Sequence, residues 1–157
     1  MLRIPLALLS ICVVSCASHP AAETTDLNRA VPTAHVVIED DFEAARAAAV
    51  TAERPLLVNF SSRACVNCRM METSIFDQPE VVAALAPYVE ARLHQDVTDE
   101  EARAAHALLV DTIGKSKAMP IYVALDPRSG DVIARFNGAT QDPGQFAYFL
   151  NEANRAR

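Results

Sequence analysis

Two cysteines, Cys65 and Cys68, lie three positions apart near the middle of the 157-residue chain. Four residues separate them from a predicted buried strand, and they open a predicted helix. At a helix N-terminus, free backbone N–H groups and the helix dipole favour a thiolate, which lowers the pKa of the first cysteine from its ordinary value of about 8.5. The second cysteine lies one turn further on, close enough to bond the first, with its sulfur facing inward. The pattern predicts a redox-active dithiol in which Cys65 is the nucleophile and Cys68 is the resolving cysteine, which attacks the mixed disulfide formed at Cys65.

Two other interpretations of the pair remain open. A zinc site needs four ligands, but the chain has no second CxxC pair, and His94 and His106 supply no recognised spacing. A static structural disulfide is geometrically possible, although closing so short a loop restrains the unfolded chain little. The sequence favours thiol–disulfide exchange, which needs neither a metal nor an organic cofactor.

Basic residues flank the pair in sequence. Arg63 and Arg69 lie on either side of it, and Lys115 and Lys117 precede a strand that starts at a proline. Either these residues make the site locally positive, or they are ordinary surface charges.

Alternating strands and helices must position the cysteines. The apolar run at 56–60, interrupted only by Asn59, is typical of a strand covered on both faces and therefore central. A turn-rich segment at 126–131 predicts an antiparallel hairpin between its flanking strands. The sequence thus predicts an α/β fold, a central mixed sheet with helices on both faces. The expected strands are 36–38, 56–60, 88–94, 119–125 and 132–136, and the expected helices are 42–52, 65–76, 81–85, 98–113 and 143–154.

The N-terminus has the features of an export signal. A short positive start precedes an apolar stretch at 4–14, which is too short to span a bilayer. The four residues ending at Cys16 resemble the bacterial lipobox, which implies that Cys16 is lipidated and becomes the first residue. We therefore expect a lipoprotein signal peptide at 1–15, a flexible tether at 16–34 and one folded domain at 35–157, with His35 solvated. The alternatives are cleavage further downstream, which gives a soluble secreted protein, and a buried helix of a cytosolic domain.

The composition of the chain limits the classes of protein to which it can belong. The chain is 51% hydrophobic and 22% charged, which is typical of a folded globular protein. No apolar run reaches the length of about 18 residues that a transmembrane helix requires. The net charge of -6 repels phosphate backbones and argues against nucleic acid as a partner.

The sequence resembles the thioredoxin superfamily, and in detail the periplasmic C-terminal domain of the thiol:disulfide interchange protein DsbD and its free-standing relatives. The resemblance covers residues 36–154. The motifs that carry it are Leu57-Val58-Asn59-Phe60, Cys65-Val66-Asn67-Cys68-Arg69, the stretch from Glu72 to Val81, and Met119-Pro120.

The resemblance implies a thioredoxin fold and a site opposite Cys65. Met119-Pro120 would form a cis peptide bond there, and the Met119 backbone would pair with an incoming substrate chain. The sequence also departs from the family. Ala64 replaces the usual Trp before the nucleophile, which should leave a more open site.

A second departure lies beneath the cysteines. Asn59 occupies the place of a buried Asp that takes a proton from the resolving cysteine in many relatives, and Asn cannot titrate. Water, Glu72 or another group would then do that work, or resolution is slower. Arg92 is expected at a solvated strand end, with a position beneath the site as the alternative.

Together these observations predict a lipid-anchored thiol:disulfide oxidoreductase of the bacterial cell envelope that faces the periplasm. Its partners would be protein thiols and disulfides, and the preferred direction is reduction, because Val66-Asn67 supplies no His to stabilise a thiolate further. A reductase of this kind requires a membrane reductant donor. The alternative is a non-enzymatic envelope lipoprotein that uses a thioredoxin scaffold as a protein-binding module.

Overall fold

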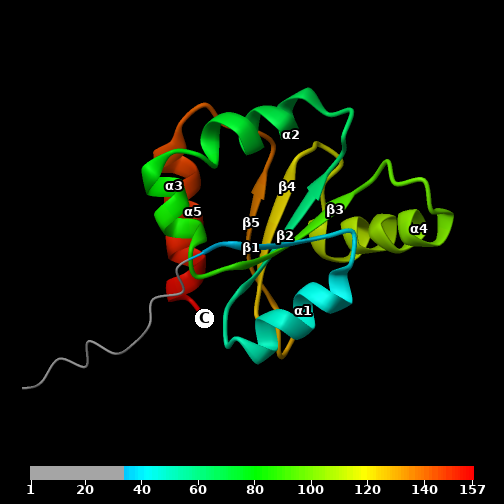
Figure 1. Cartoon of the computed structure of the whole chain (residues 1–157), viewed down its shortest axis with the longest axis horizontal. Coiled ribbons are helices and arrows are strands. Elements are labelled where there is room, and N and C mark those ends of the chain that lie inside the picture. The colour runs from blue at the N-terminus through cyan, green and yellow to red at the C-terminus, as the bar shows by residue number, and fades with distance from the viewer. Residues whose placement is uncertain (1–33) are drawn as a thin grey trace, which may run out of the picture.

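The computed structural model describes residues 34–157. Strands and helices alternate along most of this part of the chain (Figure 1). The strands are β1 (Val36–Glu39), β2 (Leu56–Ser61), β3 (Val89–His94), β4 (Ile121–Leu125) and β5 (Val132–Asn137). The helices are α1 (Phe42–Thr51), α2 (Val66–Met70), α3 (Pro79–Leu85), α4 (Glu100–Leu109) and α5 (Pro143–Arg155), and two π-helical turns, η1 (Met71–Ile75) and η2 (Val110–Gly114), continue α2 and α4.

The strands form one mixed sheet in the order β1-β3-β2-β4-β5. β3 pairs in parallel with β1 and β2, whereas β4 pairs antiparallel with β2 and β5. The predicted α/β class, the central strand and the hairpin are confirmed. This topology is that of a thioredoxin fold.

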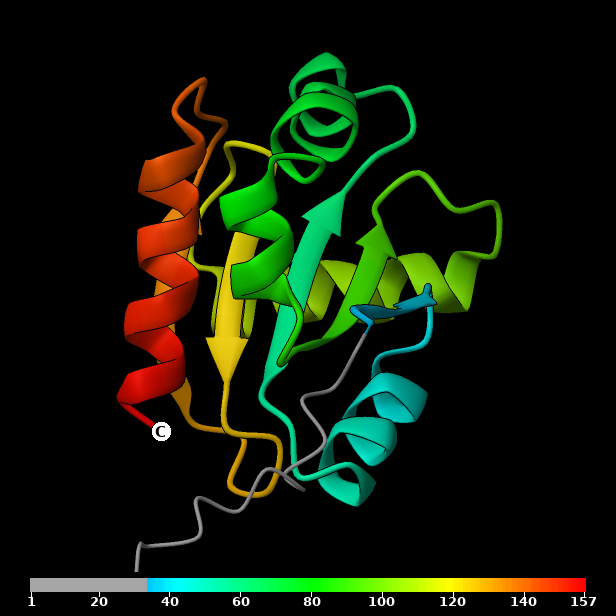
Figure 2. The ribbon, with the colours of Figure 1, turned by 60° about the vertical axis from the view of Figure 1, so that its left-hand side comes forward.

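Helices cover both faces of the sheet (Figures 1 and 2). Successive strand residues point to opposite faces. β2 therefore places Leu57 in a core cluster with η1, α3 and α5, and its other apolar side chains in a second cluster with α1, α4 and η2. Every residue of β2 is buried, including the polar Asn59 and Ser61.

The helices differ in detail from the sequence prediction. The helix expected at 65–76 changes to π-helical geometry at η1, where Phe76 N donates to Met71 O. At η2, Lys115 N donates to Val110 O in the same i to i−5 pattern, and Lys115 then adopts a left-handed conformation with φ of 56°. Hydrophobic periodicity over a few residues does not distinguish one additional residue per turn.

β4 begins at Ile121 and not at Met119, because Pro120 has no N–H to donate to a strand partner. Ile121 pairs with Phe60, so the segment before β4 lies at the end of the sheet where β2 stops. The same end carries the start of α2 (Figure 2). Within 34–157, no helix is long and apolar enough to cross a membrane.

Candidate active site

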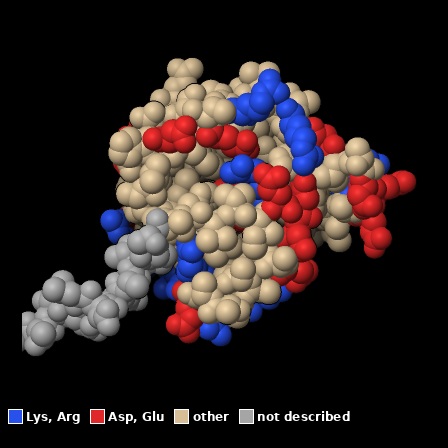
Figure 3. All heavy atoms as spheres, in the orientation of Figure 1, with Lys and Arg blue, Asp and Glu red and all other residues tan. Residues whose placement is uncertain are grey.

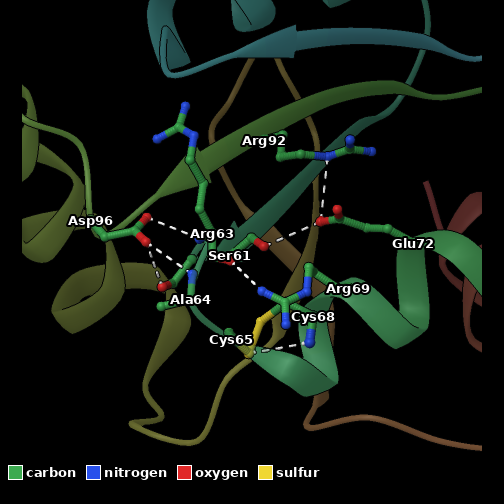
Figure 4. Close-up of a disulfide and its surroundings, with 10 residues drawn as sticks. Ser61, Arg63, Ala64, Cys65, Cys68, Arg69, Glu72, Arg92 and Asp96 are labelled. Carbon is green, nitrogen blue, oxygen red and sulfur yellow. Dashed lines mark hydrogen bonds and ion pairs between the residues drawn. A yellow bond between two sulfur atoms is a disulfide. The ribbon is translucent and has the colours of Figure 1, made fainter.

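Cys65 and Cys68 form a disulfide at the start of α2, with their Cα atoms 5.3 Å apart (Figure 4). Cys65 is the N-cap of the helix, and its sulfur accepts a hydrogen bond from Cys68 N at 3.1 Å. Cys65 is partly exposed, whereas Cys68 is only 1% exposed. Solvent therefore reaches Cys65 but hardly reaches Cys68.

The segment before Cys65 is held by one carboxylate, Asp96, from the connection between β3 and α4. Asp96 accepts hydrogen bonds from Ser62 Oγ at 3.0 Å, Arg63 N at 3.0 Å and Ala64 N at 3.1 Å (Figure 4). The hydrogen bond from the Arg63 backbone is the largest cause that lowers the pKa of Asp96. No sequence pattern predicts this role of Asp96, because the contact joins segments about thirty residues apart.

Arg63 and Arg69 also fix this segment. Arg63 pairs with Asp40 at 3.0 Å, and Arg69 Nη1 donates to the Arg63 carbonyl at 2.7 Å. Burial opposes the charge on Asp40, but hydrogen bonds from His94 and Arg63 outweigh burial and lower its pKa. Both arginines therefore have structural partners at the site.

The face drawn in Figure 3 carries Lys and Arg atoms directly beside Asp and Glu atoms. It is a mixed surface and not a uniformly basic one. Lys115 and Lys117 are exposed in the segment before β4.

A group of hydrogen-bonded polar side chains lies beneath α2. Ser61 Oγ donates to Glu72 Oε1 at 3.1 Å (Figure 4). Glu72 follows Cys68 by four residues on the same helical segment, a spacing that brings side chains to one helix face. Asn59 Nδ2 donates to Glu90 Oε1 at 2.9 Å, and both residues are fully buried.

Two expectations for this region are wrong. Arg92 is not a solvated strand end: its side chain is 17% exposed and lies 2.8 Å from Glu90 and 3.8 Å from Glu72. His35 is not free in solvent either, because its Nε2 lies 2.9 Å from Glu90 Oε2. Both side chains contact the buried carboxylate of Glu90 on β3. Nothing in the local sequence indicates that Glu90 is buried.

The Met119–Pro120 peptide bond is cis, as the resemblance implies. Pro120 is buried, Met119 is partly buried, and Pro120 O accepts a hydrogen bond from Gly138 N at 2.8 Å. The pairing of Ile121 with Phe60 brings this bond to the same end of the sheet as Cys65.

The family model described as thioredoxin-like matches residues 37–127, which include both cysteines and the cis proline. The chain belongs to the thioredoxin-like family. No curated protein matches the sequence.

Solved structures of thioredoxin-like proteins share the fold at low sequence identity. A thioredoxin from Thermus thermophilus aligns with a TM-score of 0.59 and 24% identity, over 74% of this chain and 85% of its own. The DsbH oxidoreductase aligns with a TM-score of 0.57 and 17% identity, over 90% and 96%. The reduced C-terminal domain of Neisseria meningitidis DsbD aligns with a TM-score of 0.57 and 18% identity, over 74% and 99%.

Asn59, which departs from the family pattern, has a buried partner in this structure. Asn59 is not an isolated polar residue, because its amide group contacts the carboxylate of Glu90 on the neighbouring strand. A buried carboxylate therefore lies beside Asn59, on β3 and not on β2. Ala64 is exposed beside Cys65.

The two histidines that the zinc hypothesis considered do not approach the cysteines. His94 Nδ1 lies 3.0 Å from Asp40 Oδ1, and His106 Nδ1 lies 2.9 Å from the His94 carbonyl. Within the described residues, no group of three or more His, Cys, Asp or Glu side chains is arranged to hold a metal ion.

The N-terminal predictions fall outside the described residues. These are the signal peptide at 1–15, lipidation at Cys16, and all of the tether at 16–34 except Ala34.

Proposed function

We propose that this thioredoxin-like protein is a thiol:disulfide oxidoreductase acting on protein substrates. The observation that carries the proposal is a disulfide between a partly exposed cysteine at a helix start, Cys65, and a buried cysteine, Cys68. An accessible thiolate can attack a substrate disulfide, and a buried thiol beside it can complete the exchange without competing for substrate.

In the reducing direction, the reaction starts from the dithiol. The Cys65 thiolate attacks one sulfur of the substrate disulfide, a mixed disulfide forms, and the other substrate sulfur leaves and takes up a proton. Cys68 then loses its proton and attacks the Cys65 sulfur. The second substrate thiol leaves, so two electrons pass to the substrate and the Cys65–Cys68 disulfide remains.

Cys68 needs a proton acceptor for the second step, and Glu72 is our candidate. It lies one turn after Cys68, and its carboxylate already accepts a hydrogen bond from Ser61. Met119, beside the cis bond, is the candidate for backbone pairing with the substrate chain. An external dithiol must reduce the pair after each cycle, and a membrane reductant donor fits an envelope location.

The decisive measurement is equilibration of the purified protein with glutathione buffers of graded ratio. We expect one two-electron transition of the Cys65–Cys68 pair, near the potential of about −270 mV that is typical of reducing thioredoxins. Alkylation of free thiols followed by mass analysis reports the state of each cysteine. A pair that stays oxidised across the whole range would instead support the protein-binding module.

We propose separately that Cys16 carries a lipid anchor that holds the domain at the periplasmic side of the envelope. In a bacterial host, the full chain should fractionate with membranes, and Cys16→Ala should release it or block its processing. Cys12→Ala is the matched control, since Cys12 would be removed with the signal peptide. A wild-type protein found entirely in the soluble fraction would contradict the anchor and leave the redox proposal intact.

A further inference from the structure

Lys115 and Lys117 are the only lysines of the chain, and both lie in the short segment that leads to the cis proline. The chain has fourteen Lys and Arg residues against twenty Asp and Glu residues, which give it a net charge of -6. Both lysines are exposed. An acidic protein thus carries two exposed cations side by side in sequence, next to its candidate active site.

The fold does not use the charge of either lysine. Each of the ten arginines among residues 34–157 donates a hydrogen bond to a backbone carbonyl or a carboxylate. Within the same residues, neither lysine takes part in an ion pair. Lysine carries a compact charge on a flexible stem, which suits contacts that have no fixed geometry. Both charges are therefore available to a group from another molecule.

The loop that carries the lysines extends from the end of the sheet where Cys65 lies. Its two ends are anchored together, because a Cβ added to Gly114 would lie 3.5 Å from Phe60 Cε2 and 3.7 Å from Ile121 Cδ1. Ile121 itself pairs with Phe60. Cys65 follows Phe60 by five residues, and Lys117 precedes Ile121 by four. The lysines and the reactive cysteine thus extend beyond the same pair of strands.

A substrate chain that pairs with the Met119 backbone passes close to these lysines. Lys117 is two residues from Met119, so their Cα atoms are at most about 7 Å apart. Paired chains lie about 4.7 to 4.9 Å apart. The long Lys side chains can therefore reach substrate side chains next to the substrate cysteine.

The opposite side of the site carries the other sign of charge. The sheet order places β4 on one side of β2 and β3 on the other. The segment after β3 and the first turn of α4 carry exposed carboxylates, and Asp and Glu atoms gather over α4 (Figure 3). These carboxylates are Asp96, Asp99, Glu100 and Glu101. A substrate segment thus meets positive charge on the β4 side and negative charge on the β3 side.

The other charged groups near the loop are fixed or offset. On the β4 side, Arg135 Nε donates to Ile113 O at 2.6 Å, and the exposed Asp111 of η2 carries the opposite charge. The net charge there is consequently that of the two lysines. Beside the cysteines, Arg63 pairs with Asp40 at 3.0 Å.

Arg69 adds a positive charge on α2, but its Nη1 donates to the Arg63 carbonyl at 2.7 Å. This contact holds its guanidinium group against the segment before Cys65. The lysines differ from Arg69, because no contact within residues 34–157 fixes their ammonium groups.

We propose that Lys115 and Lys117 are specificity-determining residues, which select substrate segments with Asp or Glu side chains on one side of the reactive cysteine. The ammonium groups attract those carboxylates while the substrate chain pairs with Met119. Acidic side chains on the other side of the substrate cysteine face the carboxylates after β3 and are repelled. This inference rests on the proposed exchange function and names its substrate class.

The test compares three peptides that each contain one cysteine and are oxidised to disulfide-linked dimers. One has two Glu residues directly before the cysteine, one has two Glu residues directly after it, and the third has Gln at all of these positions. The reduced full chain is mixed with each peptide. Acid quenching, alkylation and mass analysis then give the rate of reduction at each peptide concentration.

One of the two acidic peptides should react about three- to tenfold faster than the Gln peptide at low concentration, the effect of two exposed ion pairs. The gain should lie in the half-saturating concentration and not in the limiting rate, because the lysines contact the substrate and not the reacting sulfurs. About 1 M salt should remove the gain, since the Debye length falls to about 3 Å.

The double variant Lys115→Gln/Lys117→Gln should bring the ratio of the two rates close to one. Lys117→Gln alone leaves the left-handed Lys115 in place and should remove about half of the gain on a logarithmic scale. The matched control is Arg128→Gln/Arg155→Gln, since these side chains are 63% and 71% exposed. They lie on the β4–β5 turn and at the end of α5, away from α2 (Figure 2). The control should keep the full gain.

The outcomes separate the inference from the proposed function. Equal rates for all three peptides, equal gains for both acidic peptides, or a gain that survives in folded Lys117→Gln and in the double variant would overturn the role of the lysines while exchange continues. If the reduced protein reduces none of the peptides, the proposed function is wrong and the inference fails with it.

Discussion

Replacing Cys65 with Ser is expected to lower the rate of protein-disulfide reduction by more than about a thousandfold, because it removes the nucleophile of a covalent reaction. Cys65 is the N-cap of α2 and the more exposed cysteine of the pair, so no other described residue can take its place at the site. The measurement is turnover of a model protein disulfide with a dithiol as the electron source.

Cys68→Ser is the matched variant of the same pair and should behave differently. It retains the attacking sulfur but cannot resolve the mixed disulfide, so a covalent complex with the substrate should accumulate. Mass analysis of that complex would identify the partner. Equal trapping by Cys65→Ser and Cys68→Ser would contradict the assignment of roles.

The second large effect is on stability. Phe146 of α5 is fully buried and forms the centre of an aromatic cluster, with ring centroids 4.7 Å from Tyr122 and 5.3 Å from both Phe76 and Phe136. Phe146→Ala should lower the free energy of unfolding by about 3 to 5 kcal/mol, since it removes buried apolar area and leaves a cavity. Urea unfolding of the oxidised protein measures this change.

Tyr148 provides the control on the same helix. Its side chain is large and aromatic, but it is 67% exposed. Tyr148→Ala should change the free energy of unfolding by less than about 0.5 kcal/mol. Similar losses for both substitutions would mean that the cluster around Phe146 does not contribute the packing energy assigned to it.

Features that depend on local sequence were predictable. Three such features depend only on residues close together in sequence: the apolar run of β2, the turn at 126–131 and the spacing of Cys65 and Cys68. The structure has the corresponding strand, hairpin and disulfide. The cis bond at Met119–Pro120 was also expected, but only because the motif resembles a known family.

Features that depend on contacts across strands were not predictable. Whether Glu90 is buried depends on the register of β3 against β2 and on the helices that cover that face. Once Glu90 is buried, Arg92 and His35 must approach it, because an unpaired buried charge is costly. Both were assigned to solvent in the sequence analysis, since each was judged without its partner.

The contact between Asp96 and the backbone before Cys65 has a practical consequence for protein engineering. Residues 62–64 are hydrogen-bonded to a carboxylate from another part of the chain and not to their sequence neighbours alone. A CxxC segment transplanted into another thioredoxin-like scaffold would arrive without this attachment. The two segments are thus a single transferable unit, and a chimaera that exchanges residues 62–68 should carry Asp96 with them.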